Sequence, residues 1–119
     1  MSVLVDTSVW IDHFRAGNER LKSLLFDQQV FCHRSIIGEL ACGTLRKRRE
    51  ILANLKALPE AHLVEHEEVM SFLEAHRLYG QGIGWVAAHL LASTLLTRSA
   101  IWTFDKPLRR AAAALNVLA

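Results

Sequence analysis

The stretch VLVDTSVW, residues 3–10, decides the fold class of this chain. Its first three residues form a short apolar run rich in β-branched side chains, which predicts a buried strand ending at Asp6. From there the apolar residues follow helical spacing as far as Arg15, and either Thr7 or Ser8 is a suitable N-cap. An apolar strand that leads directly into a helix is typical of proteins in which strands and helices alternate.

The same pattern returns further along the chain. Short apolar runs at 30–32 and 101–104 predict two more strands, and Pro107 suits the first turn of a final helix. A weaker strand is expected at 62–64, and residues 116–119 form either a fifth strand or a frayed end. Further helices are expected at 19–28, 51–58, 67–79 and 85–96.

Alternating strands and helices predict an α/β fold with three layers, α/β/α, around a central, mostly parallel sheet of four to five strands. The 119 residues, 51% of them hydrophobic, fit a single domain over 1–119.

A net charge of +2 does not by itself indicate a nucleic-acid-binding protein. We find no signal-peptide pattern and no membrane-spanning stretch. Cys32 and Cys42 suit two reduced, buried thiols of a cytoplasmic protein.

Three of the twelve acidic residues occupy unusual positions. Asp6 and Asp105 each follow a predicted strand directly, and the carboxyl ends of parallel strands form the reactive edge of such sheets. Glu39 lies among apolar residues on a helix for which Ser35 is the expected N-cap, and burying an unpaired carboxylate is costly. Carboxylates that converge repel one another unless a hard cation such as Mg²⁺ or Mn²⁺ lies between them. The three acids therefore predict a metal site in which they lie within a few ångströms of one another.

Each of these acids also has an ordinary structural explanation. Asp6 is placed to cap the helix that follows it. Glu39 has Arg34 and Arg46 nearby as ion-pair partners, and Asp105 is placed to cap the last helix or to pair with the adjacent lysine. Without a metal site, all three of these structural explanations would have to hold at once. A metal site explains the three acids together, which favours that interpretation.

Four blocks of sequence together resemble the PIN-domain nucleases, and among these the VapC toxins of bacterial toxin–antitoxin pairs. The blocks are VDTSVWIDHF at 5–14, IIGELACG at 36–43, GIGWVAAHLLAS at 82–93 and IWTFDKPL at 101–108. They stand in the family's order and span nearly the whole chain. The resemblance implies a PIN-like fold and a Mg²⁺- or Mn²⁺-dependent endoribonuclease in which metal-activated water attacks the RNA phosphodiester. It also implies a VapB-type antitoxin, tRNA or ribosomal RNA as substrate, and a homodimer.

The resemblance assigns roles to particular residues. Thr103 matches the family's hydroxyl residue before the last acid and would position water or metal. Either Ser8 or Thr7 would hold a metal-bound water. Three of the family's metal-binding acids are matched by Asp6, Glu39 and Asp105.

One departure from the family pattern falls in the third block. The family usually has an aspartate immediately before the Ala-His-Leu-Leu-Ala-Ser stretch, and this chain has Ala87 there. The change is either an engineered inactivation or a natural one, and it predicts a weakened or inactive enzyme. The alternative function is a non-catalytic PIN-like domain that binds RNA or an antitoxin without cleaving.

The remaining candidates are basic and histidine residues. The run 46–49 is more typical of a solvated face than of an RNA contact, whereas Arg109 and Arg110 are better placed to hold RNA. His33 and His89 lack the partners of a metal site, and we expect them to be structural.

The aromatic residues are expected to serve packing. Apolar stripes on the first two helices predict a groove for an antitoxin peptide or a dimer contact. The stripes consist of Trp10 with Phe14 and of Leu21 with Leu25. We expect core or interface roles rather than base stacking for Trp10, Trp85 and Trp102.

Overall fold

The computed structural model describes residues 2–119. Its elements, in chain order, are β1 (Val3–Val5), α1 (Thr7–Ala16), α2 (Glu19–Phe26), β2 (Val30–Phe31), α3 (Arg34–Cys42), α4 (Arg48–Lys56), α5 (His66–Ala75), α6 (Trp85–Thr97), β3 (Ala100–Trp102) and α7 (Lys106–Ala114). Strands and helices alternate as the sequence predicts. None of the helices in this part of the chain combines the length and the apolar character needed to cross a membrane.

The sheet places β1 in the centre, with the strand order β2-β1-β3 and both pairs parallel. β1 is buried along its whole length, which explains why its sequence is a continuous apolar run rather than an alternating one. Val5 at the end of β1 is in register with Trp102 at the end of β3. The residues that follow these two strands therefore emerge side by side.

The described residues form three strands, fewer than the four to five expected. The segment 62–64 is not a strand, because the His62 N–H bonds the Thr97 hydroxyl and the His62 carbonyl accepts a hydrogen bond from Ser93. Both polar groups of this backbone unit are therefore satisfied by α6 instead of by a ladder. Each edge of the sheet is extended by one isolated parallel bridge, Cys32 with Glu60 and Ile101 with Leu118.

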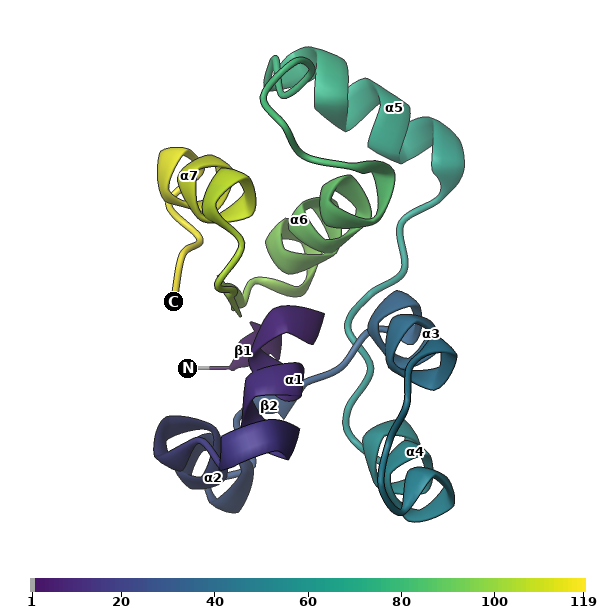
Figure 1. Cartoon of the computed structure of the whole chain (residues 1–119). Helices are drawn as coiled ribbons and strands as arrows, with labels where there is room; N and C mark the ends of the chain where they lie inside the picture. The colour runs from purple at the N-terminus through teal and green to yellow at the C-terminus, as the bar shows by residue number, and fades with distance from the viewer. Residues whose placement is uncertain (1) are drawn as a thin grey trace.

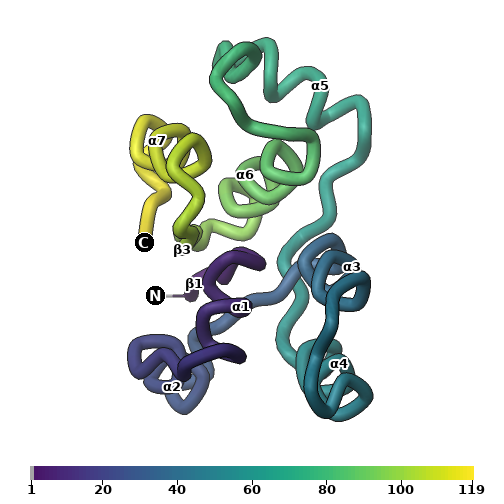
Figure 2. The backbone as a smooth tube through the Cα atoms, viewed as in Figure 1, coloured from purple at the N-terminus to yellow at the C-terminus, as the bar shows by residue number. Residues whose placement is uncertain are grey.

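Helices cover both sides of this small sheet, so the α/β/α arrangement of the PIN-like fold is confirmed. In Figure 1, α5, α6 and α7 lie above the strands, and α1 to α4 lie level with them or below. α6 is apolar nearly all round and supplies six buried residues, as befits a helix packed on several sides. The backbone trace in Figure 2 brings the two chain ends close together beside β1 and β3.

Two helices begin differently from the sequence expectation. Asp6, rather than Thr7 or Ser8, holds the N-cap position of α1, and its side chain makes no capping hydrogen bond. α3 is capped by His33, whose ring Nδ1 accepts the Ser35 N–H at 3.0 Å. Ser35 was the better candidate by residue type, but the buried imidazole two residues earlier supplies the acceptor.

Candidate active site

The candidate site begins where β1 and β3 end. The Asp6 N–H donates to the Trp102 carbonyl at 2.9 Å, which continues the parallel pairing one step beyond the strands. Asp6 and Thr103 therefore leave the sheet as neighbours although 97 positions separate them in the sequence. Parallel strands end at the same edge of a sheet, which is why residues that follow two neighbouring strands meet there.

The Asp6 carboxylate is held by two hydroxyl groups. Its Oδ2 accepts hydrogen bonds from Ser8 Oγ at 2.9 Å and from Thr103 Oγ1 at 2.7 Å. Both hydroxyl protons are used in this way, so no proton remains for the 3.4 Å contact between the two hydroxyl oxygens. Asp6 is 8% exposed, and the two donors compensate for burying its charge.

The same two hydroxyls also tie down the segment that carries Asp105. Thr103 Oγ1 accepts the Asp105 N–H at 3.0 Å, and Ser8 Oγ accepts the Phe104 N–H at 3.0 Å. Thr103 is completely buried, and its hydroxyl contacts both the Asp6 carboxylate and the Asp105 N–H. Ser8 likewise makes one donated and one accepted hydrogen bond within the protein, and its water-holding role stays a prediction.

Asp105 combines a structural role with an available oxygen. Its Oδ2 accepts the Leu108 N–H at 3.0 Å and so caps α7, as one of the structural explanations predicts. No ion pair joins it to Lys106 within residues 2–119. The side chain is exposed, because the cap leaves the carboxylate at the surface beside the strand ends.

Glu39 approaches the site from α3. Thr7 Oγ1 donates to Glu39 Oε1 at 2.8 Å, which joins α3 to the start of α1 across 32 positions of sequence. The expected ion pair with Arg34 does not form, because Arg34 binds Glu60 at 3.2 Å instead. Glu39 is exposed, so the prediction of an acid in apolar surroundings is wrong. The apolar neighbours in the sequence lie on other faces of the helix.

One cleft of about 560 Å³ brings these residues together. Its wall includes Asp6, Glu39 and Asp105 together with Ala87, the third residue of α6. The remaining lining residues are Thr7, Ser8, Ile11, Gly82, Gly84, Trp85, Val86, Leu90 and Leu108. The position at which the family usually has an aspartate therefore faces the same space as the three acids.

The three carboxylates share the cleft without forming a compact cluster. In the part of the chain that the structure describes, no group of three or more His, Cys, Asp or Glu residues is close enough to hold one ion. The three carboxylates therefore do not lie within a few ångströms of one another, whereas the sequence predicts that they do. Each acid is held by a different element: Asp6 by the strand-end hydroxyls, Glu39 by Thr7 and Asp105 by the start of α7.

The donor set nevertheless suits a hard divalent cation. In residues 2–119 each of the three carboxylates uses one oxygen for hydrogen bonds within the protein and leaves the other without a protein partner. Hydrogen bonds that orient a carboxylate and leave its second oxygen free are typical of the surroundings of metal ligands. Oxygen ligands of this kind are those preferred by Mg²⁺ and Mn²⁺.

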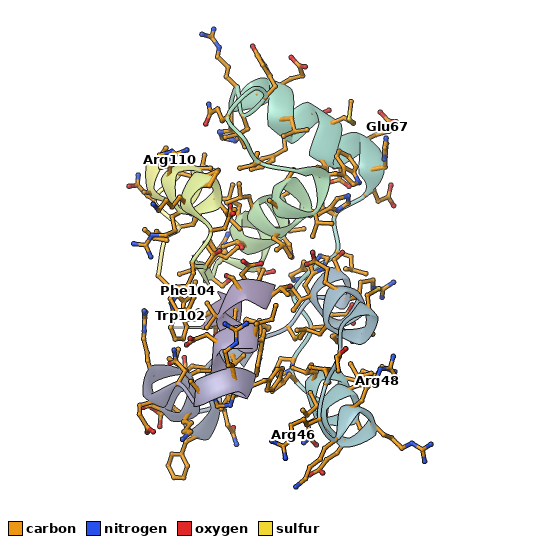
Figure 3. All side chains as sticks on the ribbon, in the orientation of Figure 1. Arg46, Arg48, Glu67, Trp102, Phe104 and Arg110 are labelled. Atoms are coloured by element: carbon orange, nitrogen blue, oxygen red, sulfur yellow. The ribbon has the colours of Figure 1, made fainter. Side chains whose placement is uncertain are left out.

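Basic residues are distributed unevenly around the cleft. Arg48 donates to the Ala41 carbonyl at 3.0 Å, and in Figure 3 Arg46 and Arg48 lie beside α4, apart from Phe104 and the strand end. This position agrees with the interpretation of the 46–49 run as a solvated face. Arg109 reaches back to the Thr103 carbonyl at 3.4 Å and thus lies next to the site.

Cysteines take no part in lining the cleft. Cys32 is 2% exposed, and burial raises the pKa of its thiol to about 11, so the thiol stays protonated at neutral pH. Cys42 is free and exposed, contrary to the expectation that both thiols are buried. It is the last residue of α3, where the chain leaves the core.

Trp85 is the lining residue whose position sequence reasoning missed. Trp10 and Trp102 are 3% and 4% exposed, as expected of core residues, whereas Trp85 is 41% exposed. The sequence signal for its exposure is its position directly after the glycine-rich loop with Gly82 and Gly84, at the first turn of an apolar helix. Helix periodicity alone does not show which face of that first turn remains uncovered.

Comparison with known proteins agrees with this geometry. Residues 3–114 match the family model described as the PIN domain. The chain is 45% identical over 112 residues to Ribonuclease VapC32 of Mycobacterium tuberculosis, from strain CDC 1551 / Oshkosh and equally from strain ATCC 25618 / H37Rv. The aligned region covers 93% of this chain and 90% of each relative. The resemblance drawn from the four sequence blocks is confirmed.

Proposed function

Because this chain belongs to the PIN-domain family and is a relative of the VapC ribonucleases, we propose that it is the toxin of a VapBC-type pair. In this proposal it is an endoribonuclease that depends on Mg²⁺ or Mn²⁺. The observation that carries the proposal is the shared cleft. Asp6, Glu39 and Asp105 reach it from three different elements, each with one oxygen free of protein partners. RNA phosphodiester bonds are the proposed substrate, with tRNA or ribosomal RNA as the class.

The three acids have distinct tasks in this proposal. Asp6, Glu39 and Asp105 would hold the metal, which would lower the pKa of a bound water and offset charge on the attacked phosphate. Thr103 and Ser8 keep Asp6 in a single orientation and fix the segment leading to Asp105. Thr7 does the same for Glu39. Arg109 and Arg110, both exposed on α7, supply positive charge for the RNA backbone.

The proposal includes a weakened site in the present chain. The side chain of Ala87 offers no polar atom to the cleft wall, although its place in the first turn of α6 suits an acid. A carboxylate there is favoured by the helix N-terminus by about 0.3–1 kcal/mol. It would also add negative charge to a site that must hold a doubly charged ion.

The test is the substitution Ala87→Asp. We expect Mn²⁺ affinity and RNA cleavage to rise about 10–100-fold, the usual effect of a group near a metal site. Isothermal titration with Mn²⁺ and cleavage of a mixed tRNA and ribosomal RNA preparation measure the two effects. Ala53→Asp, which adds the same charge at an exposed position of α4 outside the cleft, is the matched control.

Asp105→Asn in the Ala87→Asp background is the inactive control. Equal metal affinity and equal cleavage for the parent chain, Ala87→Asp and Ala53→Asp would show that position 87 does not matter. Cleavage that survives Asp105→Asn would contradict the assignment of the cleft as the active site.

A second function is supported by the same observations. The alanine at position 87 and the absence of a compact ligand cluster in residues 2–119 favour a non-catalytic PIN-like domain that binds RNA or an antitoxin. Binding of RNA without cleavage by both the parent and Ala87→Asp, with Mn²⁺ present, would support this alternative over the enzyme.

We also propose a VapB-type antitoxin and a second copy of the chain as partners. Trp10 and Leu21, the first members of the two apolar stripes, are buried in the chain's own core. Phe14 and Leu25 remain half-buried and line a cavity of about 190 Å³ beside α4. Sedimentation of the chain alone and with its antitoxin tests both partners, and a monomer at all concentrations contradicts the homodimer. RNA and antitoxin together imply a cytoplasmic location.

A further inference from the structure

Trp85 is an exposed aromatic residue in the wall of the candidate active site. It is the first residue of α6 and follows Gly84, which carries no side chain that would cover it. Trp85 is one of the residues that line the cleft, together with Asp6, Glu39 and Asp105. Trp85 is 41% exposed, so part of its surface is available to a ligand.

Two imidazole rings hold the indole in place. The His66 ring of α5 lies 4.9 Å from it between centroids and is tilted by 50°. The His89 ring, one turn further along α6, lies 4.7 Å away in an edge-on arrangement at 86°. Contacts from two helices restrict the rotamers of Trp85, so less conformational entropy is lost when a ligand covers its free surface.

The chemistry of the cleft limits what this surface binds. Its wall carries three carboxylates, so an acidic group is repelled in the absence of a cation, whereas an uncharged flat ring is not. A nucleotide has both parts: a phosphate, which would bind the cation that the acids hold, and a neutral base with a π-face. Tryptophan stacks on every base, which suits contact with single-stranded or looped RNA.

We propose that Trp85 is the base-stacking platform of this cleft and holds a nucleotide next to the scissile phosphate. The inference rests on the proposed ribonuclease function and adds to it a residue that positions the substrate. His66 and His89 act through Trp85 by fixing the ring. Trp10 and Trp102, which are buried, serve the core.

The test compares Trp85→Leu and Trp85→Phe with the parent chain. A fluorescein-labelled single-stranded RNA 12-mer of mixed sequence is titrated with each protein in Mn²⁺, and anisotropy gives the affinity. We expect Trp85→Leu to weaken binding about 5- to 150-fold and Trp85→Phe to retain most of the affinity. Phe26→Leu is the matched control, because Phe26 is 88% exposed at the end of α2 and does not line the cleft.

Intrinsic fluorescence supplies a readout that a merely structural role would not change. Unlabelled 12-mer should quench the tryptophan emission of the parent, and Trp85→Phe, which keeps only the two buried indoles, should lose that quenching. Repeating the titration with a series of 12-mers, each carrying one abasic nucleotide, should show one position at which parent and Trp85→Leu bind equally well.

The outcomes separate this inference from the proposed function. If Ala87→Asp cleaves RNA while Trp85→Leu binds it as tightly as Phe26→Leu does, the stacking role is overturned and the ribonuclease stands. If no variant binds or cleaves RNA, both the stacking role of Trp85 and the proposed ribonuclease function are overturned. Trp85→Leu that binds RNA normally but sediments as a monomer, when the parent is a dimer, would assign Trp85 to the subunit interface and overturn its role in stacking.

Discussion

The two sides of the cleft differ: a strand half, with Asp6 at the end of β1, and a helix half, with Glu39 of α3 and Ala87 of α6. Asp6 is 8% exposed and accepts two hydrogen bonds from hydroxyl groups. Glu39 is exposed and accepts one. The strand half is positioned by backbone pairing between β1 and β3, with Val5 opposite Trp102. The helix half depends on how α3 and α6 pack around the sheet. Ala87, the departure from the family pattern, lies on this second half.

The difference indicates where the site tolerates change. Asp6 is part of a buried network with Thr103 and Ser8, so altering it disturbs both the chemistry and the fold. Glu39 is exposed, so a substitution there changes the charge in the cleft with little effect on packing, whereas Ala87 is half-buried and packs against the core.

The largest expected effect tests this contrast directly. In the Ala87→Asp background, Asp6→Asn should reduce RNA cleavage by more than about 100-fold, because a neutral amide replaces one of the proposed metal-binding acids. Glu39→Gln should reduce cleavage about 10–100-fold and leave the free energy of unfolding unchanged, because Glu39 is exposed. Cleavage assays and urea denaturation measure the two quantities.

Asp27→Asn makes the same chemical change at an exposed position after α2, outside the cleft, and serves as the control. If Glu39→Gln destabilised the fold as much as Asp6→Asn did, the division of the cleft into two unlike halves would be wrong.

A smaller effect is expected at Thr103, which is completely buried. Thr103→Val keeps the side-chain shape but removes a donor to Asp6 and the acceptor of the Asp105 N–H. We expect a loss of about 1–3 kcal/mol in the free energy of unfolding, the cost of leaving buried polar groups unpaired. Thr103→Ser keeps the hydroxyl and should recover most of this loss in urea denaturation. Equal stability of the Val and Ser variants would show that the network contributes nothing.

The smallest expected effect concerns the start of α3, which carries Glu39. Burial lowers the pKa of His33 below its ordinary value of 6.5, and the charge on His89 acts in the same direction. The unfolded chain therefore binds the proton first as pH falls. The stabilising contribution of His33 is complete above pH 6.5 and is lost progressively below it.

Protonation also removes the lone pair with which His33 Nδ1 accepts the Ser35 N–H, a cap worth about 1 kcal/mol. His33→Asn keeps a capping side chain that does not titrate. Thermal unfolding between pH 5 and 8 should show a weaker pH dependence for this variant. Burial also lowers the pKa values of His13 and His89, so some dependence should remain. An unchanged pH profile in His33→Asn would contradict the role assigned to the cap.

Much of the fold follows from local sequence patterns. The apolar runs at 3–5, 30–32 and 101–104 coincide closely with β1, β2 and β3, because a fully buried parallel strand requires a continuous apolar segment. The rule that parallel strands end at one edge then places Asp6 and Thr103 side by side, and Asp105 soon after. The run at 62–64 also predicts a strand, but its hydrogen bonds go to Ser93 and Thr97, more than thirty positions away, and local sequence does not show such contacts.

The order of the elements and the family could be predicted from neighbouring residues and short motifs, which also single out the three candidate acids. Tertiary structure alone decided which oxygen of each acid is held by the protein. Thr103 reaches Asp6 across 97 positions and Thr7 reaches Glu39 across 32, and neither contact leaves a periodic signal. The exposure of Trp85 was decided in the same way. It depends on which helices pack beside the first turn of α6, and contacts between elements distant in sequence govern that packing.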